Sequence, residues 1–334
     1  MSTPGTHSTR PGPRHVVAVV VLVPLVAALA LWAFAWPAAR TAPHDLPLGV
    51  AGPATATVQI QQQLARHQGA FEIHRYADET AAREAVEDRT VYGAIVVTAQ
   101  GPELLTASAA SPVVAQLLQQ AMSAEGARPR TVDVVAAPES DPRGAALAAS
   151  VLPLALAGIA AGAAVSVRGL RGIRAVTALV GASALVGVIA AAIAHSWLGV
   201  LTGDWWAEAA VLGLSTLAVS SAVAGLAALL GHAGIGIAAG TLMLFGNPFS
   251  GAGSAPQMLP EPAGAIGQWL PPGAGTTLLR SVSYFDGAAA LGPALTLIWW
   301  AAIGLGAVLL GSALKSRTGV AKQSAAEREP APAG

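Results

Sequence analysis

Long apolar segments flank one long polar stretch in this 334-residue chain. A helix needs about 20 mostly apolar residues to cross a bilayer, and the first such segment runs over 16–37. Five further apolar blocks follow the polar stretch, at 147–167, 175–194, 207–230, 235–249 and 292–314. The pattern predicts a polytopic α-helical membrane protein with six transmembrane helices. The block at 235–249 is short and glycine-rich, and it runs straight into a stretch full of proline and glycine.

The first apolar segment has two interpretations. Arg10 and Arg14 precede it and small residues follow it, as in a cleaved signal peptide. Its length, however, exceeds the roughly 7–15 apolar residues of a signal peptide. Trp32 and Trp36 near one end also fit the aromatic belt of a membrane anchor. We therefore expect a retained transmembrane helix.

Basic residues predict the orientation of the chain. Three groups of them flank the apolar blocks: Arg10 and Arg14; Arg168, Arg171 and Arg174; and Lys315, Arg317, Lys322 and Arg328. All nine fall on one side if there are six crossings, and basic residues in short loops face the cytoplasm. We therefore expect the tails 1–15 and 315–334 to be cytoplasmic, and the last to be disordered. Because the chain is also rich in Ala, Gly and Arg, we expect a multi-pass protein of a bacterial plasma membrane.

The polar region 38–146 is expected outside the membrane as a small α/β domain. Short apolar or alternating runs predict strands near 46–52, 70–76, 91–97, 103–108 and 130–137, with helices at 55–69, 78–89 and 111–123 between them. Strands that alternate with helices predict a parallel or mixed sheet. The histidines and carboxylates here lack the spacing of a metal site or a catalytic triad. We interpret them as parts of solvated helix faces, with Asp78 as the cap of its helix.

Composition narrows the function classes. Only 11% of the residues are charged, against about 25% in soluble domains. The net charge of zero argues against a nucleic-acid partner, and the absence of cysteine excludes disulfides and thiolate chemistry. No G-x-x-x-x-G-K-[ST] motif is present, so any energy for transport has to come from another polypeptide. We expect no catalytic group, cofactor or metal.

Polar residues near the membrane are few. His195, Asp204 and Glu208 lie close together in sequence, next to Trp205 and Trp206. We interpret them as an interfacial cluster, because tryptophans mark the water interface and a solvated carboxylate costs little there. An enzyme site would require the three polar groups to converge. A proton-coupled pump is not expected, because its relay needs charged groups inside the membrane.

The segment 246–275 poses a separate question, because proline and glycine break helices beside an apolar block. Three interpretations are open: an ordinary loop, a broken helix that lines a site, or a short structure that re-enters the bilayer. Pro271 and Pro272 are expected to end one short interfacial helix. A second helix then begins near 273 and places Tyr284 and Phe285 at the lipid headgroups.

Three stretches and the general layout resemble a known family. The stretches are "VYGAIVV" (91–97), "FGNPFSG" (245–251) and "IGQWLPPGAGTTLLRSVSYFDG" (266–287). The layout is one span, an outer domain and five more spans. Together with the three stretches, this layout resembles the permeases of type-2 ABC exporters. The nearest branch carries an extracytoplasmic domain after the first span and is YhgE/phage-infection-protein-like.

The resemblance implies an ABC exporter permease that works as a homodimer or heterodimer with a separate ATP-binding subunit. It implies that 250–290 forms a re-entrant or interfacial outer gate, with candidate residues Asn247, Pro248, Phe249, Trp269, Pro271, Pro272 and Arg280. The turn with Arg168, Arg171 and Arg174 becomes a candidate ATPase-coupling loop, although orientation alone also explains its charge. The alternative is a non-transporting, membrane-anchored surface protein whose outer domain binds a partner or senses the envelope. The substrate is not indicated.

Overall fold

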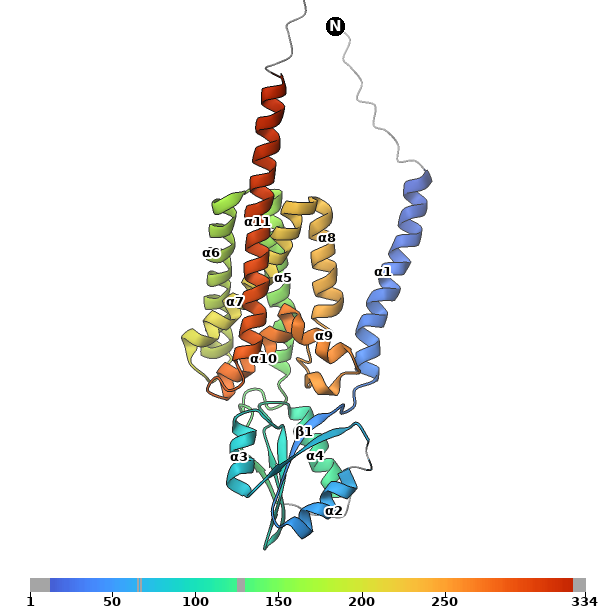
Figure 1. The fold of residues 1–334 in the computed structure, drawn as a ribbon, viewed down its shortest axis with the longest axis vertical. Helices are drawn as coiled ribbons and strands as arrows, with labels where there is room; N and C mark the ends of the chain where they lie inside the picture. Colours follow the sequence, from blue (N-terminus) through green and yellow to red (C-terminus); the bar gives the residue numbers. More distant parts are fainter. Residues whose placement is uncertain (1–12, 65, 67, 125–129, 327–334) are drawn as a thin grey trace, which may run out of the picture.

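A bundle of long apolar helices carries a small α/β domain at one end (Figure 1). This is a computed structural model, which describes residues 13–64, 66, 68–124 and 130–326. Five of its helices have stretches long and apolar enough to cross a membrane. They are α1 (Pro13–Ala39), α5 (Ala145–Val167), α6 (Gly172–Ala191), α7 (Trp205–Leu230) and α11 (Leu291–Ala326). By the length and composition of these helices the chain is a multi-pass membrane protein, as the sequence predicts.

The block expected as the fifth span is shorter than the others. It forms α8 (His232–Thr241), which continues as one π-helical turn, η2 (Leu242–Gly246). At 1.5 Å per residue the apolar helix His232–Gly246 is about 22 Å long, less than the roughly 30 Å of hydrocarbon in a bilayer. The structure therefore shows five long apolar helices and one shorter one, where the sequence predicted six spans.

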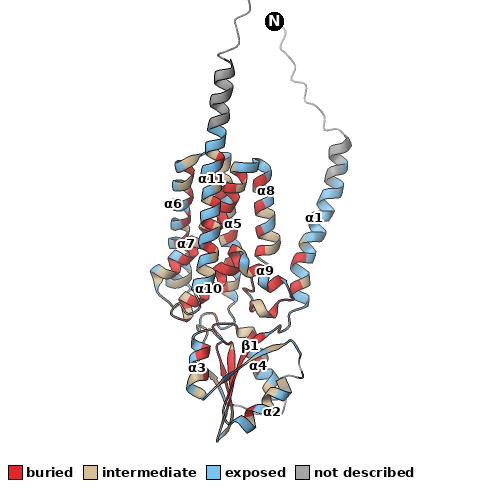
Figure 2. Ribbon diagram, in the orientation of Figure 1, coloured by how far each residue is buried: buried red, intermediate tan, exposed pale blue. Residues whose placement is uncertain are grey.

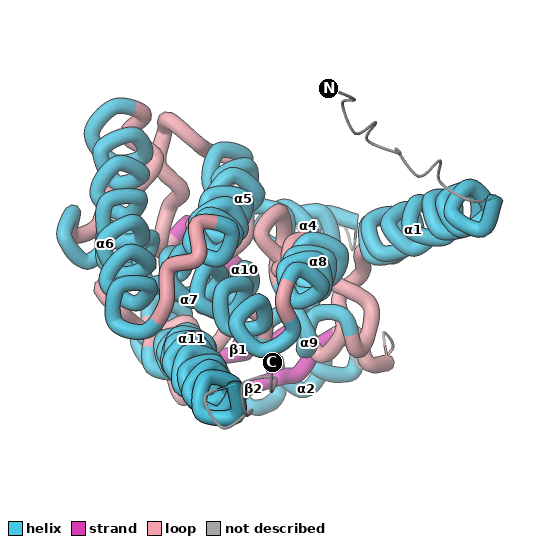
Figure 3. Tube along the Cα trace, turned by 90° about the horizontal axis from the view of Figure 1, so that it is seen from above, coloured by secondary structure: helices cyan, strands magenta, loops and turns pink. Residues whose placement is uncertain are grey.

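Helix α7 is the buried centre of the bundle, between α5, α6 and α11 (Figures 2 and 3). Glycines allow its neighbours to approach closely. A Cβ on Gly162 of α5 would lie 2.5 Å from the carbonyl oxygen of Ser220, and one on Gly187 of α6 would lie 2.3 Å from that of Ala209. Small residues at such crossings let helices pack without a hydrophobic driving force, which explains the Ala/Gly/Ser content of the spans.

The α/β domain, which we call the outer domain after its expected side of the membrane, contains a five-stranded mixed sheet in the order β2-β1-β3-β4-β5. The strands are β1 (Leu46–Ala51), β2 (Phe71–Tyr76), β3 (Gly93–Thr98), β4 (Gly101–Thr106) and β5 (Arg130–Asp133). Strand β1 pairs in parallel with β2 and β3, β4 is antiparallel to β3, and β5 is parallel to β4. The sheet and its place between the first and second long apolar helices are as predicted.

Three helices complete this domain: α2 (Ala54–Leu64), α3 (Glu79–Glu87) and α4 (Pro112–Ala124). Asp78 caps α3 by accepting the Ala81 N–H at 2.9 Å, as expected. Helix α3 buries Val86 against the sheet and exposes Glu84 and Glu87, so the wet helix face is confirmed. Leu118 of α4 packs with a second core cluster that includes β1 and β4 residues.

Candidate functional site

The segment between α8 and α11 folds as a layer between the bundle and the outer domain (Figure 1). It contains a 3₁₀ turn (Pro256–Met258), α9 (Ala263–Trp269) and α10 (Pro271–Tyr284). Helix α10 is mostly buried and contacts α7, α11 and α9. An ordinary surface loop is therefore the wrong interpretation of this segment. We call Asn247–Phe285 the outer-end layer.

The prolines of the outer-end layer begin a helix. Helix α9 ends at Trp269, and Leu270 joins it to α10, in which Pro271 and Pro272 are the first two residues. The predicted end of a short helix at these prolines is therefore confirmed, and the second helix begins at Pro271, two residues earlier than predicted. Proline is tolerated there because the first N–H groups of a helix have no acceptor within the helix. Gly267 permits the fold of α9, because a Cβ on it would lie 1.6 Å from the carbonyl oxygen of Phe249.

Arg89, two residues after α3, connects the outer domain to α10. Its guanidinium donates to the main-chain carbonyl of Thr277 at 3.0 Å and also to the hydroxyl of Ser281. The same guanidinium lies 5.1 Å from the centre of the Phe285 ring, within the range of a cation–π contact. Burial lowers the pKa of Arg89. A second link comes from the Tyr92 hydroxyl, which donates to Gln257 at 2.8 Å.

These links correct the expected position of two aromatic residues. Tyr284 and Phe285 were predicted at the lipid headgroups, but Phe285 is buried in the same core cluster as Val86 of α3. The Tyr284 hydroxyl donates to the carbonyl of Val200 at 2.6 Å. Both side chains therefore stabilise contacts inside the protein, because the outer domain covers the end of α10.

Arg280 is a buried cation in the middle of α10. Only 4% of the residue is exposed, and its guanidinium donates to the main-chain carbonyl of Ala252 at 2.5 Å. Burial lowers the pKa of Arg280 to about 10, so the group still carries its charge at neutral pH. No carboxylate forms an ion pair with it within the ranges that the structure describes. Arg280 therefore fixes the loop 247–254 to α10 through a backbone contact.

A groove of about 480 Å³ lies beside this loop, within the 300–1,000 Å³ typical of small-molecule sites. Its walls come from the outer end of α1, from α4, from the start of α5 and from the loop 247–254. Helix α1 stands apart from the other long helices (Figure 3) and is mostly exposed. Of the predicted gate residues, Asn247 and Pro248 line the groove. Phe249 is buried and packs edge-on against Trp36, with ring centres 6.2 Å apart.

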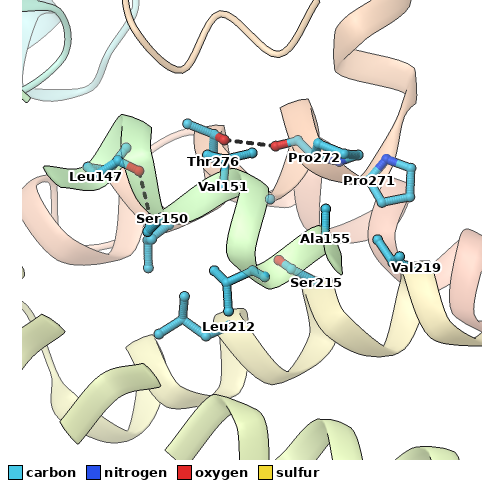
Figure 4. A pocket seen from close by; sticks show the side chains of 13 residues that line it. Leu147, Ser150, Val151, Ala155, Leu212, Ser215, Val219, Pro271, Pro272 and Thr276 are labelled. Carbon is cyan, nitrogen blue, oxygen red and sulfur yellow. Dashed lines mark hydrogen bonds between the residues drawn. The ribbon is translucent and has the colours of Figure 1, made fainter. Parts of the chain in front are cut away.

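A second, smaller hollow lies where α5, α7 and α10 meet (Figure 4). Pro271 and Pro272 line it, together with Val151, Ser215 and other residues of α5 and α7. Its volume is about 30 Å³, and a water needs about 10–15 Å³ of such volume. It has space for two or three waters and is too small for a transported molecule. Trp269, another predicted gate residue, is exposed outside both spaces.

The polar cluster near the start of α7 forms in part. Glu208 is fully buried, with one carboxylate oxygen 2.8 Å from Nδ1 of His195 and the other accepting the Gly203 N–H at 2.8 Å. Asp204 instead caps α7 by accepting the Ala207 N–H. The expectation of a solvated carboxylate is wrong, because the preceding loop folds over Glu208. The three groups do not converge, and no trio of potential metal ligands occurs among the described residues.

The predicted coupling arginines lie together at the end of the bundle away from the outer domain, which we call the inner end after its expected side of the membrane. Arg168 follows α5, Arg171 precedes α6 and Arg174 is in its first turn. All three are exposed. Within the described part of the chain, none of them has a carboxylate partner. Their arrangement leaves the turn accessible to a partner.

Comparison with known proteins found no matching family model, no matching curated protein and no matching solved structure. No activity is therefore transferred from a relative. What the chain offers chemically is a set of binding surfaces: a groove beside α1, a hydrogen-bonded outer-end layer and a basic inner turn.

Proposed function

We propose that this chain is the membrane-spanning permease subunit of an ABC-type exporter, without its own nucleotide-binding domain and powered by a separate ATPase. The observation that carries the proposal is the outer-end layer. A buried amphiphilic helix, α10, covers the end of the bundle and is hydrogen-bonded to the outer domain through Arg89. Such a layer is suited to opening and closing the outer end of a transport path when the ATPase acts at the inner end.

The proposal includes six crossings with both ends of the chain in the cytoplasm. Helix α8 runs alongside the long helices, and the start of α1 and the end of α11 lie at the same end of the molecule, away from the outer domain (Figure 1). Helix α8 is shorter than the hydrocarbon core is thick, and the outer-end layer spans the remaining thickness. Irregular backbone is tolerated at that depth because protein groups satisfy its polar atoms.

The path itself is proposed between two permease subunits. The hollow among α5, α7 and α10 is too small for a substrate, and glycine-mediated packing fills the crossings around α7. The groove beside α1 has the volume of a small-molecule site, and one of its walls is this separate helix. A second subunit, identical or related, would enclose the groove. The turn 168–174 at the inner end is the proposed contact for the ATPase.

Affinity purification of the intact protein in mild detergent tests the proposal. We expect an ATPase to copurify and to hydrolyse ATP. Changing Arg168, Arg171 and Arg174 together to Ala is expected to abolish the association while the protein still elutes as one sharp gel-filtration peak. The matched control changes three exposed arginines of the outer domain, Arg75, Arg130 and Arg143, to Ala and is expected to retain the ATPase.

The same experiment has a clear negative outcome. If no ATPase copurifies under conditions in which a known exporter keeps its own, the exporter proposal is overturned. The membrane-anchored surface protein then becomes the leading interpretation, and ligands of the outer domain become the next target.

A further inference from the structure

A cavity of about 100 Å³ lies at the inner end of the bundle, away from the outer-end layer. It is formed where the α5–α6 turn meets α11. Its polar lining includes Gly169, Arg171, Ser312 and Lys315. The Gly172 N–H donates to the Ser312 hydroxyl at 2.7 Å, which holds the start of α6 against α11. The cavity is therefore a defined space between fixed elements.

Its depth in the membrane follows from the helices that form it. Four candidate spans have an end at this level: Ala145–Val167, Gly172–Trp197, Trp205–Leu230 and Leu291–Ser316. Since each loses its apolar character at this level, the cavity lies where hydrocarbon gives way to lipid headgroups. Two apolar side chains beside the cavity are exposed: Ile173 follows Gly172, and Leu310 precedes Gly311. They are 70% and 54% exposed and provide apolar surface next to the cavity.

The charge at this end is of one sign. The chain has no Asp or Glu between Asp141 and Asp204, and none between Asp286 and Glu327. Arg171 and Lys315 consequently have no carboxylate partner among the residues that the structure describes. Arg171 also precedes α6 without a side-chain cap, so the positive end of the helix dipole adds to the two cations. Both side chains are exposed and can therefore pair with an anion from outside the chain.

We propose that this cavity binds the phosphate group of an anionic phospholipid of the inner leaflet, with Arg171 and Lys315 as its charged contacts. Phosphate pairs well with both groups, Arg through its planar fork and Lys as a point charge. A phospholipid fits better than a soluble phosphate, because the cavity lies at headgroup depth beside exposed apolar side chains. The inference goes beyond transport. Arg171 also belongs to the turn proposed to contact the ATPase, so the lipid contact is tested at Lys315, which lies outside that turn.

The test compares full-length protein in nanodiscs of phosphatidylcholine alone with nanodiscs that also contain phosphatidylglycerol. We expect phosphatidylglycerol to raise the midpoint of thermal unfolding, and native mass spectrometry to show it retained on the protein. Lys315→Gln is expected to reduce both effects several-fold. Arg174→Gln removes the same charge from α6 outside the cavity lining and is expected to leave them unchanged.

The remaining arms identify the ligand and separate this proposal from the exporter proposal. Equal losses in Lys315→Gln and Arg174→Gln would mean general surface attraction and would overturn the site. Inorganic phosphate at matched ionic strength is expected to have no effect; if it stabilises as phosphatidylglycerol does, the lipid assignment is wrong. Lys315→Arg is expected to keep the response, which guards against a folding defect in the first variant. Because Lys315 is outside the turn 168–174, its variants are expected to keep a copurifying ATPase.

Discussion

Arg89 donates a hydrogen bond to the main-chain carbonyl of Thr277 at 3.0 Å, although 188 residues separate them in the sequence. Arg89 lies two residues after α3 of the outer domain, whereas Thr277 lies within α10. The same guanidinium nitrogen also donates to the Ser281 hydroxyl, and the guanidinium lies 5.1 Å from the centre of the Phe285 ring. The contact therefore joins the outer domain to the layer at the end of the bundle, and a shift of α10 would move the outer domain.

Replacement of Arg89 is expected to weaken this connection. Hydrogen bonds from charged groups contribute about 1.5–3 kcal/mol, so Arg89→Ala should lower stability by about 2 kcal/mol and expose the junction to protease. Arg83→Ala, which removes a partly exposed ion pair with Glu79 on the same helix, should cost less than about 1 kcal/mol. Thermal unfolding in detergent and limited proteolysis measure both. Equal behaviour of the two variants would contradict a structural role for the Arg89 contact.

Two glycines of α6 give a matched test of the bundle. A Cβ on Gly187 would lie 2.3 Å from the Ala209 carbonyl oxygen, whereas one on Gly181 would meet nothing within 4 Å. Gly187→Ala should therefore separate α6 from α7 and cost about 2 kcal/mol. Gly181→Ala should be neutral or slightly stabilising, since alanine favours a helix. The two variants are compared by the yield and the unfolding midpoint of the purified protein. If Gly187→Ala has the yield and midpoint of the unmodified protein, α6 and α7 are not packed as described.

The long helices and the outer sheet could be predicted because their patterns are local. Apolar length identifies a span, and alternating runs with turn residues identify the strands at 46–51 and 71–76. Asp78 was found as a cap for the same reason. The short helix α8 was harder, because its apolar run ends before a span is complete.

The contacts of the outer-end layer could not be predicted in the same way. Nothing local to Arg89 distinguishes it from a solvated arginine, since its partners lie far along the chain. The Tyr284 and Phe285 error has the same origin: aromatic residues near a membrane usually face headgroups, but here the outer domain covers them. Glu208 was misjudged because sequence does not show that its loop folds back over it.

The buried Glu208 offers a test of that correction. Glu208→Ala would leave the Gly203 N–H and His195 without their acceptor, and it should cost about 3 kcal/mol. Glu208→Gln keeps one carbonyl oxygen for the Gly203 N–H and should cost about 1 kcal/mol. Glu84→Ala, on the exposed face of α3, is the neutral control. A Glu208→Ala protein that unfolds at the same midpoint as the control would show that the carboxylate is solvated after all.

The orientation of the chain can be measured directly, because the sequence contains no cysteine. Each introduced cysteine is then the only thiol. Ser123→Cys places it on the exposed end of α4 in the outer domain, and Leu170→Cys places it in the α5–α6 turn. On intact cells, a membrane-impermeant maleimide should label the first and not the second. Permeabilised cells should label both, which controls for accessibility.

A third cysteine decides whether α8 crosses the membrane. Ser316→Cys lies exposed near the inner end of α11, after α8 and the outer-end layer. If α8 is a sixth crossing, Ser316→Cys should be protected in intact cells together with Leu170→Cys. If α8 turns back instead, the chain crosses only five times and Ser316→Cys should be labelled with Ser123→Cys. The second pattern would place the basic end of α11 outside, contrary to the positive-inside rule, and would overturn both the six-span topology and the inner-leaflet site at Lys315.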